Sequence, residues 1–458
     1  MSGTDLVVVS NRGPLSFTLD ESGQPVSSGP SGGLAAALGP MLRSSGATWV
    51  AAAMTEADRK ATADGLMTGD GFGMVMVEPD TDVYRMAYDV VSNATLWFLH
   101  HHLFDLAHRP RIDGRWFEAW NAYRSLNRSF ATNVCECAAE GAVVLVQDYH
   151  LSLVPGMLAT RRPDLRVVHF SHTPFADPGV LRAMPTIPCR ELLEGMAGGK
   201  ACGFHTRRWE IAFRAACEDA GVDAPTTFVA PLGPDPDHIR ARASSRGAVA
   251  ARDRVAALTR GRRMVLRVDR IEPSKNFLRG FWAFEDLLQR YPEYRGNVVF
   301  VALAYTSRQS LPEYLAYGTE VELAAKRIND KWSEGDWIPV VLDVADDPDR
   351  SFAALTSYDV LLVNPVRDGL NLVAKEGPLV NANDGALVLS REAGAFEELC
   401  GPAVAINPFD VAGTADSIAS SLAMSQDERH RRDAELKRRV TSRTSRDWME
   451  DQLSAARA

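Results

Sequence analysis

Short apolar runs recur along the chain and are separated by longer amphipathic stretches, such as residues 207–220, 276–292 and 313–332. A run that is apolar at every position is typical of a strand buried on both faces, and an amphipathic stretch between two such runs is typical of a crossover helix. The runs are residues 6–10, 143–147, 166–172, 264–268, 298–305, 338–344, 360–364, 386–390 and 403–407. This alternation predicts an α/β protein with parallel, doubly wound sheets.

The apolar runs form two groups, with a stretch of different composition between them. Near residue 233 the sequence reads PLGPDPDHIRARASSRG, in which turn-forming residues precede a basic, small-residue segment. A chain of 458 residues is long enough for more than one core. We therefore expect two Rossmann-like domains, at residues 1–233 and 234–440.

The composition argues against several classes of partner. A net charge of −9 favours neither nucleic acid nor an anionic membrane, so any anion site must be local. We expect no transmembrane helix, because no apolar run reaches about 18 residues, and the N-terminus is typical of a strand rather than a signal peptide. The six cysteines lack zinc-site spacing and are expected to be reduced. These features predict a cytoplasmic protein and leave its oligomeric state open, a homo-oligomer included.

Charged and polar side chains follow directly after many of the predicted strands. They are Asn11-Arg12-Gly13, Asp148-Tyr149-His150, His172, Asp269-Arg270 with Lys275, Arg308, and the segment RDGLNLVAKE at 367–376. In doubly wound sheets, ligands bind outside the carboxyl ends of the strands. The sequence therefore predicts a ligand site at these ends, because solubility alone does not explain so many such groups in this position.

Two motifs suggest an anionic ligand. Arg270 and Lys275 can reach one diphosphate, the arginine as a fork and the lysine as a point charge, although two solvated surface cations explain this motif equally well. Gly32 and Gly33 precede a small-residue helix, where glycine lets backbone N–H groups approach an anion. Taken alone, that pair is better explained as a flexible loop, because it is not the spaced glycine fingerprint of dinucleotide-binding domains.

The segment from Asp368 to Glu376 combines a turn with a helix start. Gly369 is expected to turn the chain, and a helix is expected to begin near Asn371, where free N–H groups can hold a phosphate. Glu376 lies four residues after Leu372 and leans toward the helix N-terminus, so it can reach a sugar hydroxyl. A capped helix explains one acidic residue, but it does not explain the acidic pair together with the nearby cations.

His172 follows a buried strand and precedes a Thr-Pro turn. A lone histidine is more often a core residue, but the strand end favours a role in the site. By contrast, His100, His101 and His102 are expected not to bind a metal, because consecutive residues cannot share one face of a helix.

Seven of these motifs, in this order, resemble those of the trehalose-6-phosphate synthases, which are retaining glycosyltransferases of family 20. They are SNRGP with GPSGGL, YDVVSNATLW (88–97), QDYHL (147–151), FSHTPF (170–175), DRIEPSKN, AYTSR (304–308) and RDGLNLVAKE (367–376). The resemblance implies the glycosyltransferase B (GT-B) architecture, with two Rossmann-like domains facing a cleft. It also implies that residues 441–458 form a final helix that packs back on the first domain.

The resemblance implies roles for the matched positions. His172, Asp148 and Asp368 would lie at the reaction centre, and Arg12, Tyr88, Trp97 and Arg308 would hold the acceptor, glucose 6-phosphate. The donor nucleotide and its diphosphate would be held by a third set of residues: Gly32, Gly33, Arg270, Lys275, Gly369, Asn371, Leu372 and Glu376. The leaving phosphate is taken to accept the proton of the incoming hydroxyl, so neither a metal nor a cofactor is implied. The product would be α,α-trehalose 6-phosphate.

Two departures from the family pattern are Gln147, where members often carry histidine, and a long loop between Arg12 and Gly32. Residues 377–390 resemble a related pseudo-glycosyltransferase that couples a GDP-cyclitol to a cyclitol phosphate, which is one alternative function. The high Ala and Arg content resembles the branch of the family in which GDP-glucose users occur. Both resemblances favour GDP-glucose over UDP-glucose as the donor. The intact Arg367-Asp368-Gly369 and Tyr149-His150 favour the true transferase. A non-catalytic sugar-phosphate sensor is the other alternative, but it predicts the loss of cations that are present here.

Overall fold

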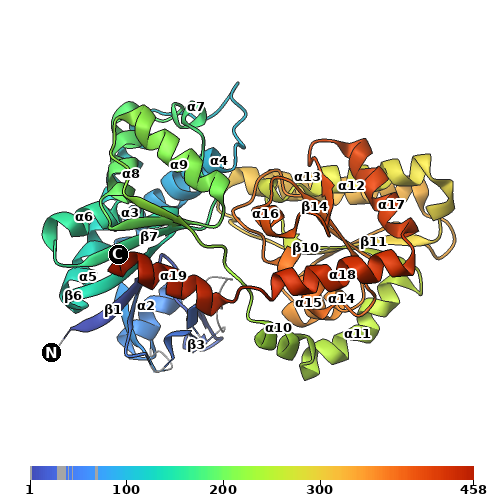
Figure 1. Ribbon diagram of the computed structural model, residues 1–458, viewed down its shortest axis with the longest axis horizontal. Coiled ribbons are helices and arrows are strands. Elements are labelled where there is room, and N and C mark those ends of the chain that lie inside the picture. The colour runs from blue at the N-terminus through green and yellow to red at the C-terminus, as the bar shows by residue number, and fades with distance from the viewer. Residues whose placement is uncertain (1–2, 28–37, 40, 44, 68–70) are drawn as a thin grey trace. The chain divides into compact units, whose positions relative to one another are not determined.

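The computed structural model describes residues 3–27, 38–39, 41–43, 45–67 and 71–458. The chain forms two compact units (Figure 1). Unit 1 comprises Met1–Pro231 and Ser445–Ala458, and unit 2 comprises Leu232–Thr444. The boundaries expected from the sequence, 233 and 440, lie within a few residues of these.

Unit 1 is built on a seven-stranded parallel sheet in the order β5-β4-β1-β6-β7-β8-β9. Its strands are β1 (Thr4–Val9), β4 (Thr48–Ala52), β5 (Gly73–Val77), β6 (Ala138–Gln147), β7 (Arg166–Ser171), β8 (Ala201–Phe204) and β9 (Thr226–Val229). Its helices are α2 (Glu56–Ala63), α3 (Thr81–Arg85), α4 (Trp97–His100), α5 (Gly114–Cys137), α6 (Val154–Arg161), α7 (Pro178–Leu181), α8 (Thr186–Ala197), α9 (Arg207–Ala220) and α19 (Ser445–Arg457). The three predicted strands are confirmed as β1, β6 and β7, while the other four were not predicted.

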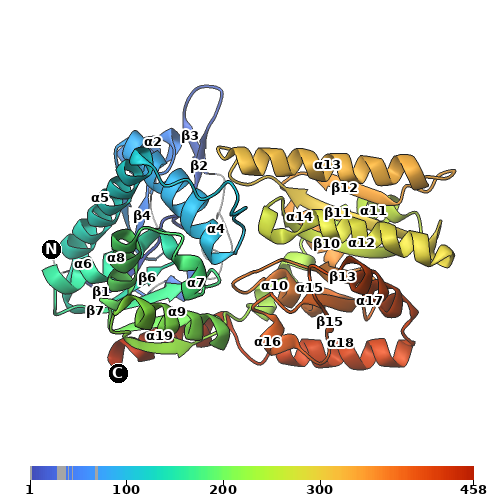
Figure 2. The same cartoon turned by 90° about the horizontal axis from the view of Figure 1, so that it is seen from above.

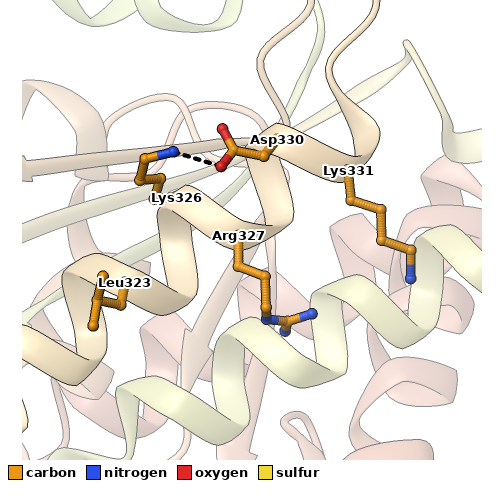
Figure 3. Close-up of a pocket in the computed structure, with 5 residues that line it drawn as sticks. All are labelled: Leu323, Lys326, Arg327, Asp330 and Lys331. Atoms are coloured by element: carbon orange, nitrogen blue, oxygen red, sulfur yellow. Dashed lines mark hydrogen bonds and ion pairs between the residues drawn. The ribbon is translucent and has the colours of Figure 1, made fainter.

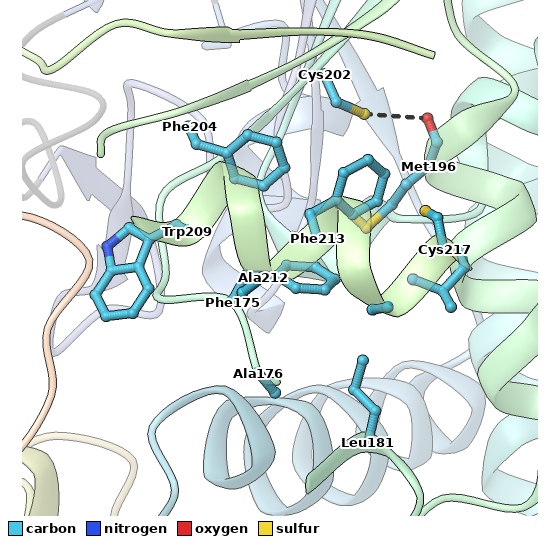
Figure 4. Packing of buried hydrophobic residues seen from close by; sticks show 12 residues of the cluster. Phe175, Ala176, Leu181, Met196, Cys202, Phe204, Trp209, Ala212, Phe213 and Cys217 are labelled. Carbon is cyan, nitrogen blue, oxygen red and sulfur yellow. Dashed lines mark hydrogen bonds between the residues drawn. The ribbon is translucent and has the colours of Figure 1, made fainter. Parts of the chain in front are cut away.

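The core beside β8 shows why this part of the sequence folds as it does (Figure 4). Helix α9 is capped at its N-terminus by Thr206, whose hydroxyl accepts a hydrogen bond from the Trp209 N–H group, and at its C-terminus by Gly221 in the left-handed conformation. Its apolar face carries Trp209 and Phe213, which pack against Phe204 of β8 and against side chains of α8. This packing holds the carboxyl end of β8, and with it the adjacent His205.

Unit 2 is built on a six-stranded parallel sheet in the order β12-β11-β10-β13-β14-β15. All six strands were predicted: β10 (Arg263–Arg270), β11 (Val298–Tyr305), β12 (Val340–Val344), β13 (Val360–Val363), β14 (Ala386–Ser390) and β15 (Val404–Ile406). Its helices are α10 (Pro236–Ala243), α11 (Arg246–Thr259), α12 (Phe277–Arg290), α13 (Pro312–Trp332), α14 (Pro348–Leu355), α15 (Val373–Val380), α16 (Phe396–Leu399), α17 (Val411–Ala423) and α18 (Gln426–Val440). Helices α13, α12 and α17 pack side by side, and so do α11, α14, α15 and α18 (Figure 2). The doubly wound prediction is confirmed.

Two features of unit 1 were not predicted. The described part of the long loop after Arg12 contains an antiparallel hairpin of β2 (Phe17–Leu19) and β3 (Pro25–Ser27). Between α3 and α4, residues Met86–Leu96 form a π-helix in which the Ser92 and Thr95 hydroxyls donate to carbonyls five residues earlier. The π-helix is rare and is frequently found at functional sites, and this one contains most of the 88–97 motif. Among the described helices, none is both long and apolar enough to cross a bilayer.

Candidate functional site

The ends of β6 and β7 bring Asp148 and His172 together. The backbone N–H group of His172 donates to Asp148 Oδ1 at 3.2 Å. Asp148 has a φ of 71°, a conformation that costs a non-glycine residue energy and is held here by its own N–H group, which donates to the Phe170 carbonyl at 2.7 Å. Backbone strain of this kind is concentrated at functional sites. The two hydrogen bonds join Asp148 and His172, which were predicted from two separate motifs, into one local structure.

Both ring nitrogens of His172 have protein partners. Nε2 lies 2.9 Å from Gln147 Oε1, and Nδ1 lies 3.1 Å from His205 Nε2. Burial, with a smaller contribution from His169, lowers the pKa of His172 to about 3, so the ring is neutral near pH 7. Both ring nitrogens of this residue, which the family resemblance places at the reaction centre, are therefore occupied by protein groups.

One acceptor candidate of unit 1, Tyr88, lies in an aromatic stack. The Tyr88 ring stacks between Tyr84 and His150, with centroid distances of 5.4 and 5.6 Å. Tyr84 accepts a hydrogen bond from Asn11, the neighbour of the exposed Arg12. The stack therefore connects the end of β1 with the segment that follows β6.

Trp97 is buried, with 3% of its surface exposed, and its ring stacks on His101 at 4.1 Å. The fourth acceptor candidate, Arg308, belongs to unit 2.

In unit 2, the residues after β10 form a buried ionic cluster. Glu272 is 1% exposed, and its Oε1 lies 3.3 Å from Arg270 and 3.4 Å from Arg308. Burial alone would raise the pKa of Glu272, but Arg270, Arg308 and Lys275 outweigh it and lower the pKa to about 2. Arg270 and Arg308 therefore share one carboxylate that is ionised near pH 7, and the Arg270 side chain is 42% exposed.

Lys275 is held by carboxylates of two different segments. Its Nζ lies 2.6 Å from Asp368 and 3.2 Å from Asp269. Burial would lower the pKa of Lys275, but the two carboxylates raise it above its ordinary value. The structure thus joins Lys275 to Asp368, which the sequence had placed in separate motifs.

A second, deeper cation holds the Lys275 loop. Arg267 is 1% exposed, lies over the Phe277 ring at 4.0 Å, and donates to the Lys275 carbonyl and to Asn364 Oδ1. Arg267 and Glu272 were not predicted as site residues, while Asp269 was expected only as one of the polar groups that follow a strand. The sequence feature that could have identified them is the alternation of charges in RVDRIE, within and just after an otherwise apolar strand.

The chain bends at Gly369, as predicted, and α15 begins at Val373, two residues after Asn371. The residue with positive φ in this turn is Asn371, at 78°. Asparagine tolerates this conformation because its side chain bonds locally: Nδ2 donates to Asp368 Oδ2, and Oδ1 accepts from the Ala374 N–H group. One of the first-turn N–H groups proposed for phosphate binding is therefore already used.

Glu376 lies in the first turn of α15, where burial raises its pKa to about 7. The adjacent Lys375 has a different role, since its Nζ lies 2.5 Å from Glu398 and donates to the Leu232 carbonyl. Gly32 and Gly33 lie outside the described residues. Among the residues that are described, no group of three or more His, Cys, Asp or Glu side chains could hold a metal ion.

A shallow surface pocket on α13 is not a candidate for this chemistry (Figure 3). It is lined by Leu323 and by charged side chains that already have partners: Lys326 with Asp330, and both Arg327 and Lys331 with Glu285. The charged side chains that follow the strands are the better candidates for a ligand site, because most of them are buried while a few, such as Arg270, are partly exposed.

Comparison with known proteins agrees with the family resemblance that the motifs indicate. The model of glycosyltransferase family 20 matches residues 4–458. The chain is 34% identical to alpha,alpha-trehalose-phosphate synthase [UDP-forming] A of Dictyostelium discoideum, over 97% of this chain and 61% of that protein. It is 33% identical to trehalose-6-phosphate synthase of Mycolicibacterium smegmatis, over 100% of this chain and 93% of that protein.

A solved structure is similar in fold as well. It is a UDP-forming alpha,alpha-trehalose-phosphate synthase from Burkholderia xenovorans in complex with glucose-6-phosphate, with a TM-score of 0.85 and 27% identity over 99% of this chain and 100% of that one. The likeness confirms the predicted GT-B class. The chain spans about three fifths of the length of two of the curated relatives that it matches.

Proposed function

The chain belongs to glycosyltransferase family 20, and on that premise we propose that it transfers glucose from a nucleoside-diphosphate glucose to glucose 6-phosphate, with retention of configuration. The product is α,α-trehalose 6-phosphate. The observation that carries the proposal is the ionic cluster after β10, in which Arg270 and Arg308 lie beside the buried carboxylate of Glu272 and Lys275 is held by Asp269 and Asp368.

In the proposed reaction, the bond between the anomeric carbon and the diphosphate oxygen breaks. The acceptor hydroxyl oxygen bonds to the same face of that carbon, and the leaving diphosphate keeps the electron pair and takes the hydroxyl proton. Arg270 and Lys275 stabilise the negative charge that develops on the diphosphate. A neutral His172 with both ring nitrogens occupied is not available as a base, which supports a role for the leaving phosphate in accepting the proton.

For the two sugars, the proposal assigns separate sets of side chains. Asp368, the turn at Gly369, Asn371 and Leu372 contact the donor sugar and phosphate, and Glu376 binds the ribose. Arg12, Tyr88, Trp97 and Arg308 hold glucose 6-phosphate, while Asp148 and the His172 backbone lie at the reacting carbon. The tight local structure that joins Asp148 to His172 supports the last assignment.

Relatives whose names state a nucleotide are UDP-forming, which favours UDP-glucose over the predicted GDP-glucose. The deciding experiment incubates the purified chain with glucose 6-phosphate and UDP-, GDP- or ADP-glucose in parallel, and measures trehalose 6-phosphate and the released nucleoside diphosphate. Formation of both products in equal amounts supports the transferase. Binding of glucose 6-phosphate without turnover of any donor would indicate a sensor, and turnover of cyclitol substrates alone would indicate the coupling enzyme.

Donor binding should depend on pH through Glu376. An ionised carboxylate accepts hydrogen bonds from ribose hydroxyls, and with a pKa of about 7 the ionised fraction rises as pH increases. The donor KM should fall by up to about ninefold between about pH 6 and pH 8, because the ionised fraction rises from roughly a tenth to nine tenths. In Glu376→Gln, initial-rate measurements should give a higher donor KM that no longer changes over this range. A wild-type donor KM that stays constant would contradict this role.

A further inference from the structure

Helix α19, at the end of the chain, packs on β6, β7 and β8 of unit 1 and places Gln452 beside the predicted reaction centre (Figure 1). Gln452 is 0% exposed, and its Oε1 accepts a hydrogen bond from Gln147 Nε2 at 3.0 Å. Gln147 in turn contacts His172, and the His172 ring contacts His205. A hydrogen-bonded chain therefore runs from α19 to the end of β8.

The side-chain amide of Gln147 explains how this series of hydrogen bonds can hold His172 in one tautomer. Gln147 carries an acceptor and a donor on one planar group, so it can receive a proton donor on one side and donate on the other. If Gln147 Nε2 donates a hydrogen bond to Gln452, then Gln147 Oε1 faces His172 and accepts a hydrogen bond from the Nε2–H group of that ring. Nδ1 of His172 then accepts from His205, which selects one neutral tautomer.

Burying the Gln452 side chain lowers the stability of the folded state. Its own amide nitrogen has no hydrogen-bond partner among the described residues, and a buried N–H group without a partner destabilises the folded state. An apolar side chain would fit this helix face at lower cost, as Met449 does nearby. Polar groups that are kept despite such a cost are expected at functional sites.

We propose that Gln452 is a positioning residue, which acts through Gln147 to fix the imidazole of His172 and thus the backbone at the end of β7. Its kinetic consequence rests on the proposed transferase function, whereas its structural consequence does not. The Trp448 ring, also on α19, contacts the His172 ring at a centroid distance of 5.6 Å and an interplanar angle of 55°. Helix α19 thereby packs against His172 through two of its side chains, one directly and one through Gln147.

The test compares Gln452→Leu, Gln147→Leu and the double variant. In the full-length wild-type chain with ¹⁵N-labelled histidine, NMR should show His172 in a single neutral tautomer, and in each variant it should show a mixture. Each single variant should lower kcat on the order of tenfold with little change in either KM, and the double variant should be no slower than Gln147→Leu alone. Gln452→Glu keeps an acceptor oxygen and should restore most of the loss.

Met449→Ala is the matched control on the same helix, and it should lower the melting temperature while leaving kcat and the His172 spectrum unchanged. The proposal would be overturned if the losses of kcat in the two single variants multiply in the double variant, or if the His172 tautomer is unchanged in Gln452→Leu. If Gln452→Leu does not fold, Gln452→Met provides the same comparison. Because the NMR measurement needs no substrate, it decides the positioning role even if the wild-type chain proves inactive as a transferase.

Discussion

Replacing Arg270 with alanine is expected to lower kcat/KM roughly a hundredfold. Removing one donor that stabilises transition-state charge costs about 3 kcal/mol, and each 1.36 kcal/mol corresponds to about a tenfold change in rate. Arg270 is the partly exposed member of the cluster around Glu272, so its guanidinium is the group best placed to meet a diphosphate. The loss should appear mainly in kcat, because the charge on the diphosphate grows as the bond breaks.

Arg263→Ala is the matched control for this prediction. Arg263 lies at the opposite end of the same strand, where it donates to the Leu422 carbonyl and lies over the Tyr294 ring. Its loss should lower stability without changing the kinetics. Initial rates with saturating glucose 6-phosphate measure both variants, and an Arg270→Ala enzyme with wild-type turnover would refute the diphosphate role.

Most of the fold could be predicted, because continuous apolar strands leave a clear pattern. All six strands of unit 2 were found in this way, and so were β1, β6 and β7. The missed strand β8 (ACGF) contains Gly, Ala and Cys in place of branched residues, and β5 (GMVMV) mixes its valines with Gly and Met, so their composition does not separate them from loops or helices. Their strand conformation comes from pairing with β4, β7 and β9, which is a tertiary effect.

The candidate site could be predicted only in part. Charges that follow strands were visible as short motifs, which located Arg270, Lys275, Asp148 and His172. The partners that hold them come from distant segments, such as Gln452 for Gln147, and no local pattern marks such pairs. The positive φ of Asn371 was not predicted, because glycine is the usual residue in that conformation.

Replacing Lys275 with methionine is expected to lower the free energy of unfolding by about 3–5 kcal/mol near neutral pH. The variant removes a cation from the buried Asp269 and the partly buried Asp368, and breaking such an ion pair from one side leaves carboxylate charge that Lys275 no longer compensates. Asp269 and Asp368 both lie within 3.2 Å of Lys275 Nζ, so the two carboxylates would also repel each other. Urea unfolding followed by circular dichroism measures the loss.

The loss caused by Lys275→Met should shrink as pH falls. Burial already raises the pKa of Asp269 above its ordinary value of 3.8, with Lys275 opposing that effect, so removing Lys275 should raise the pKa further. A carboxyl group whose pKa is higher in the folded state destabilises that state above the folded-state pKa, and the penalty disappears as pH falls toward the unfolded-state value. The difference from wild type should therefore be larger at about pH 8 than at about pH 4.5.

Lys331→Met separates this effect from the simple loss of a lysine. Lys331 is half exposed and lies 3.0 Å from Glu285, so removing it should cost no more than about 1 kcal/mol, with little dependence on pH. Equal losses for the two variants at both pH values would show that Asp269 and Asp368 do not depend on Lys275. A larger, pH-dependent loss for Lys275→Met would mean that the residue proposed to bind the diphosphate also neutralises these carboxylates before the donor arrives.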